Sequence, residues 1–266
     1  MKETMFDLKD KVALLTGATQ WLGRDMADVY AEYGASVIIT SREKEKADKA
    51  AKEISAQYGV DALGLALDVT SPESVEACCK AAFDWKGHLD ILVNNAGGGS
   101  GKSQGDLLMR DYGDIFNLIN TNLIGTIYMC KAAAKYMTEQ KSGKIINIGS
   151  IAGIVGRDRR MYHNAEKSEQ PVDYAAAKGG VIALTRDLAA VLGPYGVNVN
   201  CISPGGFDKG DLPEKFVDFY ADRTILGHMG IFGNEIKGAA LFLASPASDY
   251  VTGHNLTVDG GFSIWQ

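Results

Sequence analysis

The sequence predicts an α/β fold in which a parallel, doubly wound sheet of seven strands carries helices on both faces. Short apolar runs alternate with helix-like stretches from Val12 to Val258. Most of these runs are apolar throughout, as expected of strands that are buried on both faces. No linker, low-complexity tract or internal repeat interrupts the chain, so we expect one domain over residues 1–266.

The amino-terminal half contains strands that each lead into a helix. Pro72 marks the first position of the third helix, because its fixed φ and missing N–H suit a helix start. The expected strands lie at 11–19, 36–42, 61–70 and 90–98, and the expected helices at 22–35, 43–59 and 71–87.

The carboxyl-terminal half continues this alternation. A long helix is expected over 111–139, further helices over 171–192 and 236–245, and strands over 144–150, 197–206 and 254–261. Open parallel sheets bind ligands at the carboxyl ends of their strands, so the loops that follow the strands are the candidate site.

Composition narrows the classes of function. The net charge is −6 and no basic stripe offsets it, which argues against a nucleic-acid partner. The first residues have the features of neither a signal peptide nor a transit peptide, and no stretch resembles a membrane span, so we expect a soluble protein of the cytoplasm. The cysteines show neither disulfide nor zinc spacing; we expect no metal site and reduced thiols at Cys78, Cys79, Cys130 and Cys201.

The turn after the first strand is a candidate nucleotide site. It reads Thr-Gly-Ala-Thr-Gln-Trp-Leu-Gly from Thr16 to Gly23 and leads into a helix, whose free amides and dipole can hold a pyrophosphate. We therefore expect a Rossmann-type fold that binds a dinucleotide through Gly17, Thr19, Gln20, Trp21 and Leu22.

The end of the second strand bears on the choice of cofactor. An NAD-selective site would place a carboxylate there for the ribose hydroxyls, whereas this chain has Thr40, Ser41 and Arg42. Ser41 removes that repulsion and Arg42 can pair with a 2′-phosphate. These residues favour NADP(H) over NAD(H).

Tyr174 and Lys178 form a candidate catalytic pair. Their spacing of four places both on one face of a helix, where the ammonium favours the phenolate and prepares the tyrosine to exchange a proton with an alcohol or ketone. A Tyr-x-x-x-Lys pair is expected by chance about once in a chain of this composition, so the surrounding motifs decide its meaning.

Those motifs resemble the short-chain dehydrogenase/reductase family over nearly the whole chain. They are Asp68-Val69, Asn94-Asn95-Ala96-Gly97, Asn122, Ser150, Tyr174 with Lys178, and Pro204-Gly205-Gly206. The resemblance implies that Tyr174 is the general acid/base, that Lys178 assists it and binds the nicotinamide ribose, that Ser150 orients the carbonyl or alcohol, and that Asn122 holds a water.

The resemblance also implies cofactor contacts and an assembly. Contacts to the cofactor are expected from Asp68, Val69, Asn95, Ala96, Gly97, Tyr174, Lys178, Pro204, Gly205, Gly206 and Phe207. A homotetramer is expected through the Tyr174 helix and the long helix before it.

Three features depart from the family pattern. Trp21 stands where most members have a second glycine, so the turn could follow another path or the indole could wall the cofactor pocket. Ser150 and Tyr174 are 24 positions apart, about twice the usual spacing, which predicts an inserted loop at about 156–172. Asp208 and Lys209 occupy the region where many members have a threonine that contacts the nicotinamide amide.

The inserted loop and the stretch at about 207–233 suggest the substrate. The first carries Arg157, Arg159 and Tyr162, which could bind an anionic or many-hydroxyl substrate; the alternative is a solvated loop whose acids balance its arginines. The second is expected to be a substrate lid.

This combination of loop and lid resembles gluconate-type and polyol dehydrogenases of the family. The resemblance implies an NAD(P)-dependent oxidoreductase, with NADP(H) favoured, that acts on a polyol, sugar or sugar acid. Reduction of a 3-oxoacyl thioester is a second enzymatic reading. An inactive nucleotide-binding sensor is a third, from another functional class.

Overall fold

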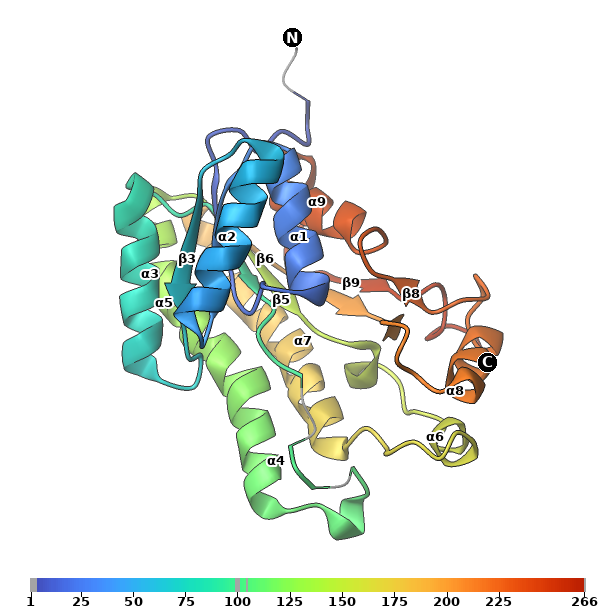
Figure 1. The fold of residues 1–266 in the computed structure, drawn as a ribbon. Helices are drawn as coiled ribbons and strands as arrows, with labels where there is room; N and C mark the ends of the chain where they lie inside the picture. Colours follow the sequence, from blue (N-terminus) through green and yellow to red (C-terminus); the bar gives the residue numbers. More distant parts are fainter. Residues whose placement is uncertain (1–3, 99–100, 104, 266) are drawn as a thin grey trace.

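The central sheet of the computed structural model, which describes residues 4–98, 101–103 and 105–265, confirms the predicted seven parallel strands (Figure 1). Their order is β3-β2-β1-β4-β5-β6-β9, doubly wound from the centre. The strands are β1 (Val12–Leu15), β2 (Ser36–Ser41), β3 (Ala62–Ala66), β4 (Ile91–Asn94), β5 (Gly143–Ile148), β6 (Val197–Pro204) and β9 (Asn255–Val258).

The covering helices begin and end at local signals in the sequence. Pro72 is at the start of α3, and the Ser71 hydroxyl accepts a hydrogen bond from the Ser74 amide at 3.2 Å. Helices α2 and α3 end at Gly59 and Gly87, both left-handed, where glycine carries no Cβ penalty. The covering helices are α1 (Trp21–Glu32), α2 (Lys44–Tyr58), α3 (Pro72–Lys86), α5 (Gly125–Gln140), α7 (Val172–Leu192) and α9 (Lys237–Ala244).

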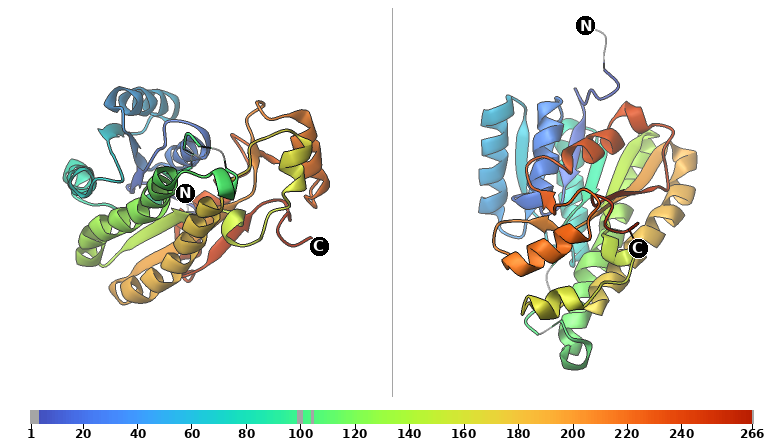
Figure 2. Two further views of the ribbon diagram at one scale, coloured as in Figure 1. Left: turned by 90° about the horizontal axis from the view of Figure 1, so that it is seen from below. Right: turned by 90° about the vertical axis from the view of Figure 1, so that its right-hand side faces the viewer.

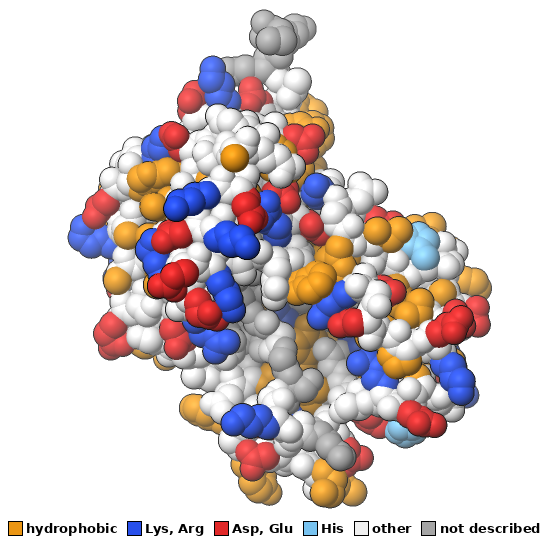
Figure 3. All heavy atoms as spheres, viewed as in Figure 1, with side chains coloured by type: hydrophobic (Ala, Val, Ile, Leu, Met, Phe, Trp, Pro, Cys, Tyr) orange, Lys and Arg blue, Asp and Glu red, His pale blue; other side chains and the backbone are white. Residues whose placement is uncertain are grey.

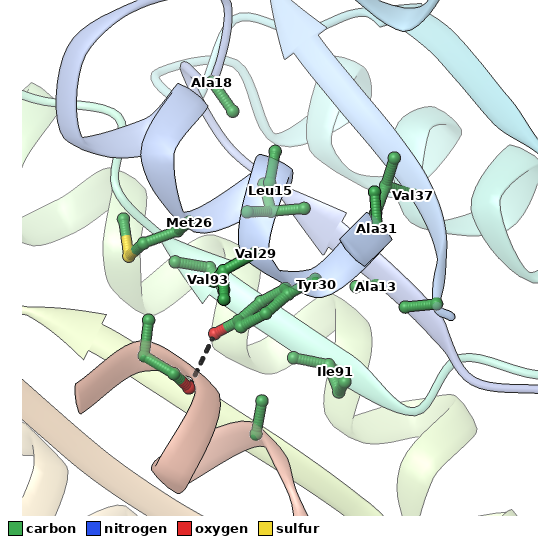
Figure 4. Packing of buried hydrophobic residues seen from close by; sticks show 14 of the residues in the cluster. Ala13, Leu15, Ala18, Met26, Val29, Tyr30, Ala31, Val37, Ile91 and Val93 are labelled. Atoms are coloured by element: carbon green, nitrogen blue, oxygen red, sulfur yellow. Dashed lines mark hydrogen bonds between the residues drawn. The ribbon is translucent and has the colours of Figure 1, made fainter. Parts of the chain in front are cut away.

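Two apolar cores form because successive strand residues point to opposite faces of the sheet. Ala13 and Leu15 of β1 pack with α1, α2 and α9, whereas Val12 and Leu14 pack with α3, α5 and α7. Figure 4 shows the first core, in which the buried Tyr30 hydroxyl donates to the Ala240 carbonyl at 3.2 Å. This bond ties α1 to α9 across the end of the sheet.

The long helix expected over 111–139 is present but not uniform. Helix α4 (Tyr112–Ile119) continues through a π-helical segment, Asn120–Ile124, into α5. Together they form a rod that extends beyond the sheet (Figure 1). Sequence periodicity did not indicate the π turn, which widens the helix by one residue at Asn122.

Residues 156–172 and 207–233 fold into additional structure, and we call these two segments the cap. They contain α6 (Arg160–Asn164), β7 (Phe207–Asp208), α8 (Glu214–Asp222) and β8 (Gly230–Ile231), with β7 and β8 paired in parallel. Helices α6 and α8 lie side by side, away from α2 and α3 (Figure 2). The sequence did not predict these elements, because helices this short form only when neighbours cover them.

An apolar cluster and an ion pair hold the cap together. Tyr162 of the inserted segment packs on Phe216 of α8, with ring centroids 5.3 Å apart. Asp158 pairs with Arg223 at 2.7 Å. A side-chain hydrogen bond from Arg160 lowers the pKa of Asp158 to about 2, so this carboxylate is charged at neutral pH. The two segments of the cap therefore pack as one unit.

The surface of the view in Figure 3 mixes lysine and arginine with acidic side chains over the face that carries α1 and α2. Between that face and the cap the surface is hollowed. Within the described residues, no helix has the length and apolarity needed to cross a membrane. Short helical turns complete the fold at Leu107–Met109, Ile151–Gly153, Gly193–Tyr195 and Pro246–Ser248.

Candidate functional site

The carboxyl ends of the central strands lie at one edge of the sheet. Strand register pairs Leu15 of β1 with Val93 of β4, and Ile148 of β5 with Ile202 of β6. The motifs predicted from the sequence follow these strand ends directly. The fold therefore brings the glycine turn, the Asn95 segment, Ser150 and the Pro204 turn to the same edge.

The glycine turn is fixed by hydrogen bonds from β4. The Thr16 hydroxyl accepts from the amides of Asn95 and Ala96 at 2.9 and 2.8 Å. The Asn95 side-chain amide donates to the carbonyls of Thr16 and Gly17, both at 3.0 Å. Asn95 thus shapes the turn with its side chain, a role distinct from the cofactor contact expected of it.

Two glycines allow this turn to approach its neighbours closely. A Cβ on Gly17, whose φ is +61°, would lie 3.0 Å from the Ala96 Cα, and one on Gly23 would lie 2.5 Å from the Asn95 amide nitrogen. At the start of α1, Gln20 provides no side-chain cap and the first turn contains no acidic residue. The amide groups there are oriented to bind an anion.

Trp21 adopts the left-handed conformation that glycine would favour, with φ of +55°. The backbone at Trp21 therefore has the conformation that a glycine would adopt at this position, and the indole as a wall of the cofactor pocket stays a prediction. The ring is 42% exposed and packs against Phe232 of the cap, with centroids 5.2 Å apart.

Ser41 and Arg42 lie at the end of β2, beside the glycine turn. The buried Thr40 hydroxyl accepts from the Gly17 amide at 3.2 Å, which couples the two loops. Arg42 is exposed, and the Ser41 hydroxyl accepts from the Glu43 amide at 3.2 Å. The Arg42 guanidinium is thus accessible to a ligand.

Asp68 and Val69 follow β3. Hydrogen bonds from the hydroxyl and amide of Thr70, at 2.7 and 2.9 Å, lower the pKa of Asp68, and the charge of Arg42 adds to this effect. Val69 is buried against Gly125 of α5. Asp68 is therefore the member of this pair that is exposed to a ligand.

Asn122 lies in the π-helical segment and is fully buried. Its side-chain oxygen accepts from the Gly98 amide at 2.8 Å, and its amide donates to the Leu118 carbonyl at 3.0 Å. A Cβ on Gly97 would lie 2.5 Å from that oxygen and 3.7 Å from the Lys178 ammonium. The loop after β4 is therefore held between Asn122 and Lys178.

Lys178 and Tyr174 share one face of α7, as their spacing predicted. The Lys178 ammonium donates to the Ile148 carbonyl at 2.8 Å and lies 5.7 Å from the centroid of the Tyr174 ring. Lys178 is buried, whereas Tyr174 is partly exposed. The phenol thus remains accessible while its cationic neighbour is anchored to β5.

Ser150 is held against the same helix through the turn that follows it. Its hydroxyl accepts from the Ala152 amide at 3.1 Å and starts the helical turn Ile151–Gly153. A Cβ on Gly153 would lie 2.5 Å from the Gly179 nitrogen and 2.7 Å from the Lys178 carbonyl carbon. This contact sets the position of Ser150 relative to α7, although 24 positions separate Ser150 from Tyr174.

The Pro204 turn is fixed from the cap side. The Gly206 amide donates to the Tyr220 hydroxyl at 2.5 Å, and the Gly205 amide donates to the Val258 carbonyl at 2.9 Å. Burial raises the pKa of Tyr220 to about 12, which keeps the phenol neutral. Phe207 begins β7 and packs on Phe232 with centroids 5.3 Å apart.

The three residues predicted to contact substrate all have partners within the cap. Arg157 donates to the Tyr162 hydroxyl at 2.6 Å, and Arg159 donates to the Gln170 carbonyl at 2.7 Å and pairs with Glu169 at 3.2 Å. Tyr162 is only 2% exposed and lies in the apolar cluster of the cap, and its contact with substrate stays a prediction.

Both arginines nevertheless line a pocket of about 230 Å³ beside α7. Arg157 Nε and Gln170 Oε1 are buried and have no hydrogen-bond partner among the described residues. The pocket is lined by residues 152–157, Arg159, Gln170, Pro171 and Ala175. A buried N–H without an acceptor costs free energy, which a ligand oxygen would recover.

Comparison with known proteins agrees with this geometry. A family model described as enoyl-(acyl carrier protein) reductase matches residues 17–263. A 3-oxoacyl-[acyl-carrier-protein] reductase of Vibrio harveyi is 40% identical over 260 residues, covering 96% of this chain and 98% of that protein. The chain belongs to the short-chain dehydrogenase/reductase family.

Other members of this short-chain dehydrogenase/reductase family differ in substrate. A 2-dehydro-3-deoxy-D-gluconate 5-dehydrogenase of Formosa agariphila is 34% identical and covers 98% of this chain and 96% of its own length. A gluconate 5-dehydrogenase from Burkholderia cenocepacia, solved in complex with NADP and tartrate, is 34% identical with a TM-score of 0.87 over 97% of each chain. The chain is therefore an oxidoreductase of CH–OH groups with a nicotinamide cofactor.

The residues at the strand ends of this short-chain dehydrogenase/reductase fit such a cofactor. Gln20 leaves the first amides of α1 without a side-chain cap, and no acid in the first turn of the helix opposes a diphosphate. When bound, the cofactor supplies or accepts the hydride. The chain itself must then place the substrate oxygen and exchange its proton.

Sequence reasoning missed two sets of buried polar side chains behind this site, an ion pair and a chain of hydrogen bonds. Arg110 and Asp173 form a bidentate ion pair at 3.2 and 2.8 Å, with side chains 1% and 4% exposed, immediately before Tyr174. A chain of amide and hydroxyl groups also runs from Asn94 through Asn147 to Thr185, at 2.8 and 3.0 Å. Neither group has a sequence signature, because its members lie far apart along the chain.

The cysteines of this short-chain dehydrogenase/reductase are unpaired and buried. Burial raises the pKa of Cys78 and of Cys130 to about 12, and that of Cys201 to about 11. The adjacent Cys79 is shifted in the same direction. Because the thiolate is the reactive form, these thiols have the character of core residues.

Proposed function

We propose that this chain is an NADP(H)-dependent oxidoreductase that interconverts a carbonyl and a secondary alcohol of a polyol, sugar or sugar acid. The observation that carries the substrate class is the pocket beside α7, where the buried Nε of Arg157 has no acceptor among the described residues. A carboxylate or hydroxyl oxygen would satisfy this N–H group.

Tyr174 is proposed to exchange the proton with the substrate oxygen. Its phenol is partly exposed and lies beside the buried Lys178 ammonium. In this role Tyr174 accepts a proton from an alcohol in one direction and returns it to a carbonyl in the other. Lys178 is anchored by the Ile148 carbonyl and so stays beside the phenol.

Ser150 and Asn122 are proposed to position the reacting groups. Ser150 is fixed against α7 and has a hydroxyl that can donate to the substrate oxygen as negative charge develops there. Asn122 keeps the loop after β4 in place and is proposed to hold a water near Lys178.

The preference for NADP(H) rests on Ser41 and Arg42. No carboxylate ends β2, and Arg42 is exposed beside the glycine turn. Arg42→Ala is expected to raise the Kd of NADPH about tenfold, as the loss of one charged hydrogen bond requires, while the Kd of NADH stays the same. Equal losses for both cofactors would contradict the assignment.

A 3-oxoacyl thioester is the second candidate substrate. It is favoured by the Vibrio harveyi relative, a 3-oxoacyl-[acyl-carrier-protein] reductase at 40% identity. The unpartnered Nε of Arg157 favours the sugar-derived class instead, because the alkyl tail of an acyl chain offers it no acceptor.

A cofactor-coupled screen of the purified protein distinguishes these candidates. Polyols, sugar acids, their keto forms and a short 3-oxoacyl thioester would be tested with both NAD(H) and NADP(H). Turnover of the sugar-derived set that falls at least tenfold in Arg157→Ala, with the Kd of NADPH unchanged, supports the proposal. Turnover of the thioester alone would replace it with the second candidate.

Tyr174→Phe is the control for the chemical step. It is expected to abolish turnover and to leave the Kd of NADPH within about twofold, since the ring remains while the proton is lost. Retained turnover would remove Tyr174 from the mechanism.

We also propose a homotetramer assembled through the long helix and α7. Exposed apolar side chains on and before α4 support an interface, because Leu108, Tyr112 and Phe116 are 91%, 88% and 67% exposed. Light scattering of the wild type and of Tyr112→Glu/Phe116→Glu tests this assembly. The cytoplasmic location remains a prediction of the sequence.

A further inference from the structure

Trp21 connects the glycine turn to both ends of the lid segment 207–233. Its ring packs on Phe232 at the end of that segment, and the Lys209 ammonium near the start lies 4.9 Å from the ring centroid. Phe207 also packs on Phe232, with ring centroids 5.3 Å apart. The Trp21 indole, at the start of α1, therefore contacts the lid segment both before and after α8.

A hydrogen bond strengthens this connection. The Gly233 amide donates to the carboxylate of the buried Asp25 at 2.8 Å, so the end of the lid is attached to α1 one turn after Trp21. The lid is thus held on the helix whose first turn faces the cofactor diphosphate. Any group carried at the start of the lid has a fixed place relative to that turn.

Lys209 is the charged group in that place. Among the described residues it has no ion-pair partner, and the carboxylate of the adjacent Asp208 instead accepts from the Gly210 amide at 2.8 Å. Arg24, the nearest arginine along α1, is paired with Asp28 and Glu53 at 2.9 and 2.8 Å. Lys209 therefore provides a positive charge against the side chain of Trp21, the first residue of α1, whose first-turn amides favour an anion.

We propose that Lys209 is a phosphate-binding residue which the lid contributes to the cofactor site, and that Trp21 is the platform that holds its ammonium over the glycine turn. The indole attracts the ammonium through its ring face and excludes water on one side. The flexible stem of lysine then allows the ammonium to move from the ring to a phosphate oxygen. Trp21 has a left-handed backbone, which is unfavourable for a residue with a Cβ, and its ring makes both contacts.

The proposal concerns the nicotinamide cofactor of the family and is independent of the substrate and of the NADP(H) preference. Two fragments of the cofactor separate the contribution of the diphosphate from that of the 2′-phosphate. ADP-ribose carries the diphosphate without a 2′-phosphate or nicotinamide, whereas 2′-AMP carries a 2′-phosphate without the diphosphate. Both can be titrated by calorimetry without any turnover.

Lys209→Ala is expected to weaken ADP-ribose and NADPH about tenfold and to leave 2′-AMP within twofold, as the loss of a charged hydrogen bond to the diphosphate requires. Lys209→Arg should restore most of the affinity for ADP-ribose. The affinity for ADP-ribose should depend less on salt concentration in Lys209→Ala than in the wild type. Lys215→Ala is the matched control, because Lys215 is an exposed lysine on α8 of the same lid. Equal affinities in the Lys209 and Lys215 variants would overturn the proposal.

Trp21 fluorescence tests the platform separately. ADP-ribose has no nicotinamide to quench tryptophan by energy transfer, so a change in emission on binding reports on the ammonium leaving the ring. This change should be present in the wild type, absent in Trp21→Phe and reduced in Lys209→Ala. Trp21→Gly should weaken ADP-ribose as much as Lys209→Ala, and the double variant should show no further loss. An emission change that persists in Trp21→Phe, or fully additive losses, would refute the coupling of the two residues.

Discussion

Gly153→Ala tests the contact that positions Ser150 against the catalytic helix. The added Cβ would lie 2.5 Å from the Gly179 nitrogen and 2.7 Å from the Lys178 carbonyl carbon, where ordinary contacts begin near 3.4 Å. Both neighbours are backbone atoms inside α7 and cannot rotate away. The turn and the helix must therefore separate by about 1 Å, as overpacked cores do.

This separation has two measurable effects. Overpacking of this kind costs about 1–3 kcal/mol, which lowers the Tm of a chain of this size by roughly 2–4 °C per kcal/mol. Displacement of Ser150 relative to Tyr174 by about 1 Å is expected to reduce kcat/KM up to 100-fold. The Kd of NADPH should change much less, because the glycine turn belongs to other strands.

Two matched glycines of the same region serve as controls. A Cβ on Gly156 meets no atom within 4 Å, and one on Gly179 meets only the backbone of Gly153 at 3.7 and 3.9 Å. Gly156→Ala should therefore leave Tm and kcat/KM near the wild type, and Gly179→Ala should be neutral or stabilise by up to about 1 kcal/mol through helix propensity. If Gly153→Ala matches Gly156→Ala in both Tm and kcat/KM, the proposed contact does not position Ser150.

Three further predictions concern buried polar groups. Arg110→Ala should lower the free energy of unfolding by about 3–5 kcal/mol in denaturant titrations, because it leaves the Asp173 carboxylate buried and unpaired. Lys80→Ala, which removes an exposed ion pair, should cause a much smaller loss. The pKa of Tyr220 is raised to about 12, so between pH 10 and 12 the unfolded chain releases a proton that the folded chain retains. The free energy of unfolding should therefore fall with rising pH. Between pH 9 and 11.5 the wild type should lose about 2 kcal/mol more of it than Tyr220→Phe. A thiol reagent at pH 8 should label no cysteine of the folded protein and all four after denaturation, since each is buried; fast labelling of the native protein would contradict the assigned burial.

Local patterns account for the parts of the fold that the sequence predicted. The apolar runs at Val12–Leu15 and Ile91–Asn94 are strands because both of their faces are covered. Pro72 and Gly87 set the two ends of α3 through their local backbone preferences. The spacing of Tyr174 and Lys178 on one helix face follows from helix geometry alone. The positions of the strand ends followed from the same patterns, and with them the edge of the sheet that carries the candidate site.

Contacts between distant segments decided the rest. Nothing near Trp21 in the sequence indicates that Phe232 and Lys209 meet its ring, or that the residue adopts a glycine conformation. Asn122, within the π turn, accepts a hydrogen bond from the Gly98 amide in the loop that follows β4, a contact between segments 24 residues apart.

Tyr162 shows the same limit most clearly. In the sequence it stands in a charged loop, and only the packing of α6 on α8 buries it against Phe216. The sequence by itself determined the sheet, the alternation of strands and helices along the chain, and the residues placed at the strand ends. These features depend on periodicity and on short-range backbone preferences. The tertiary structure decided which of those residues touch, which are buried and how the cap closes over them, because free energies of burial and pairing depend on neighbours that the chain supplies from far away.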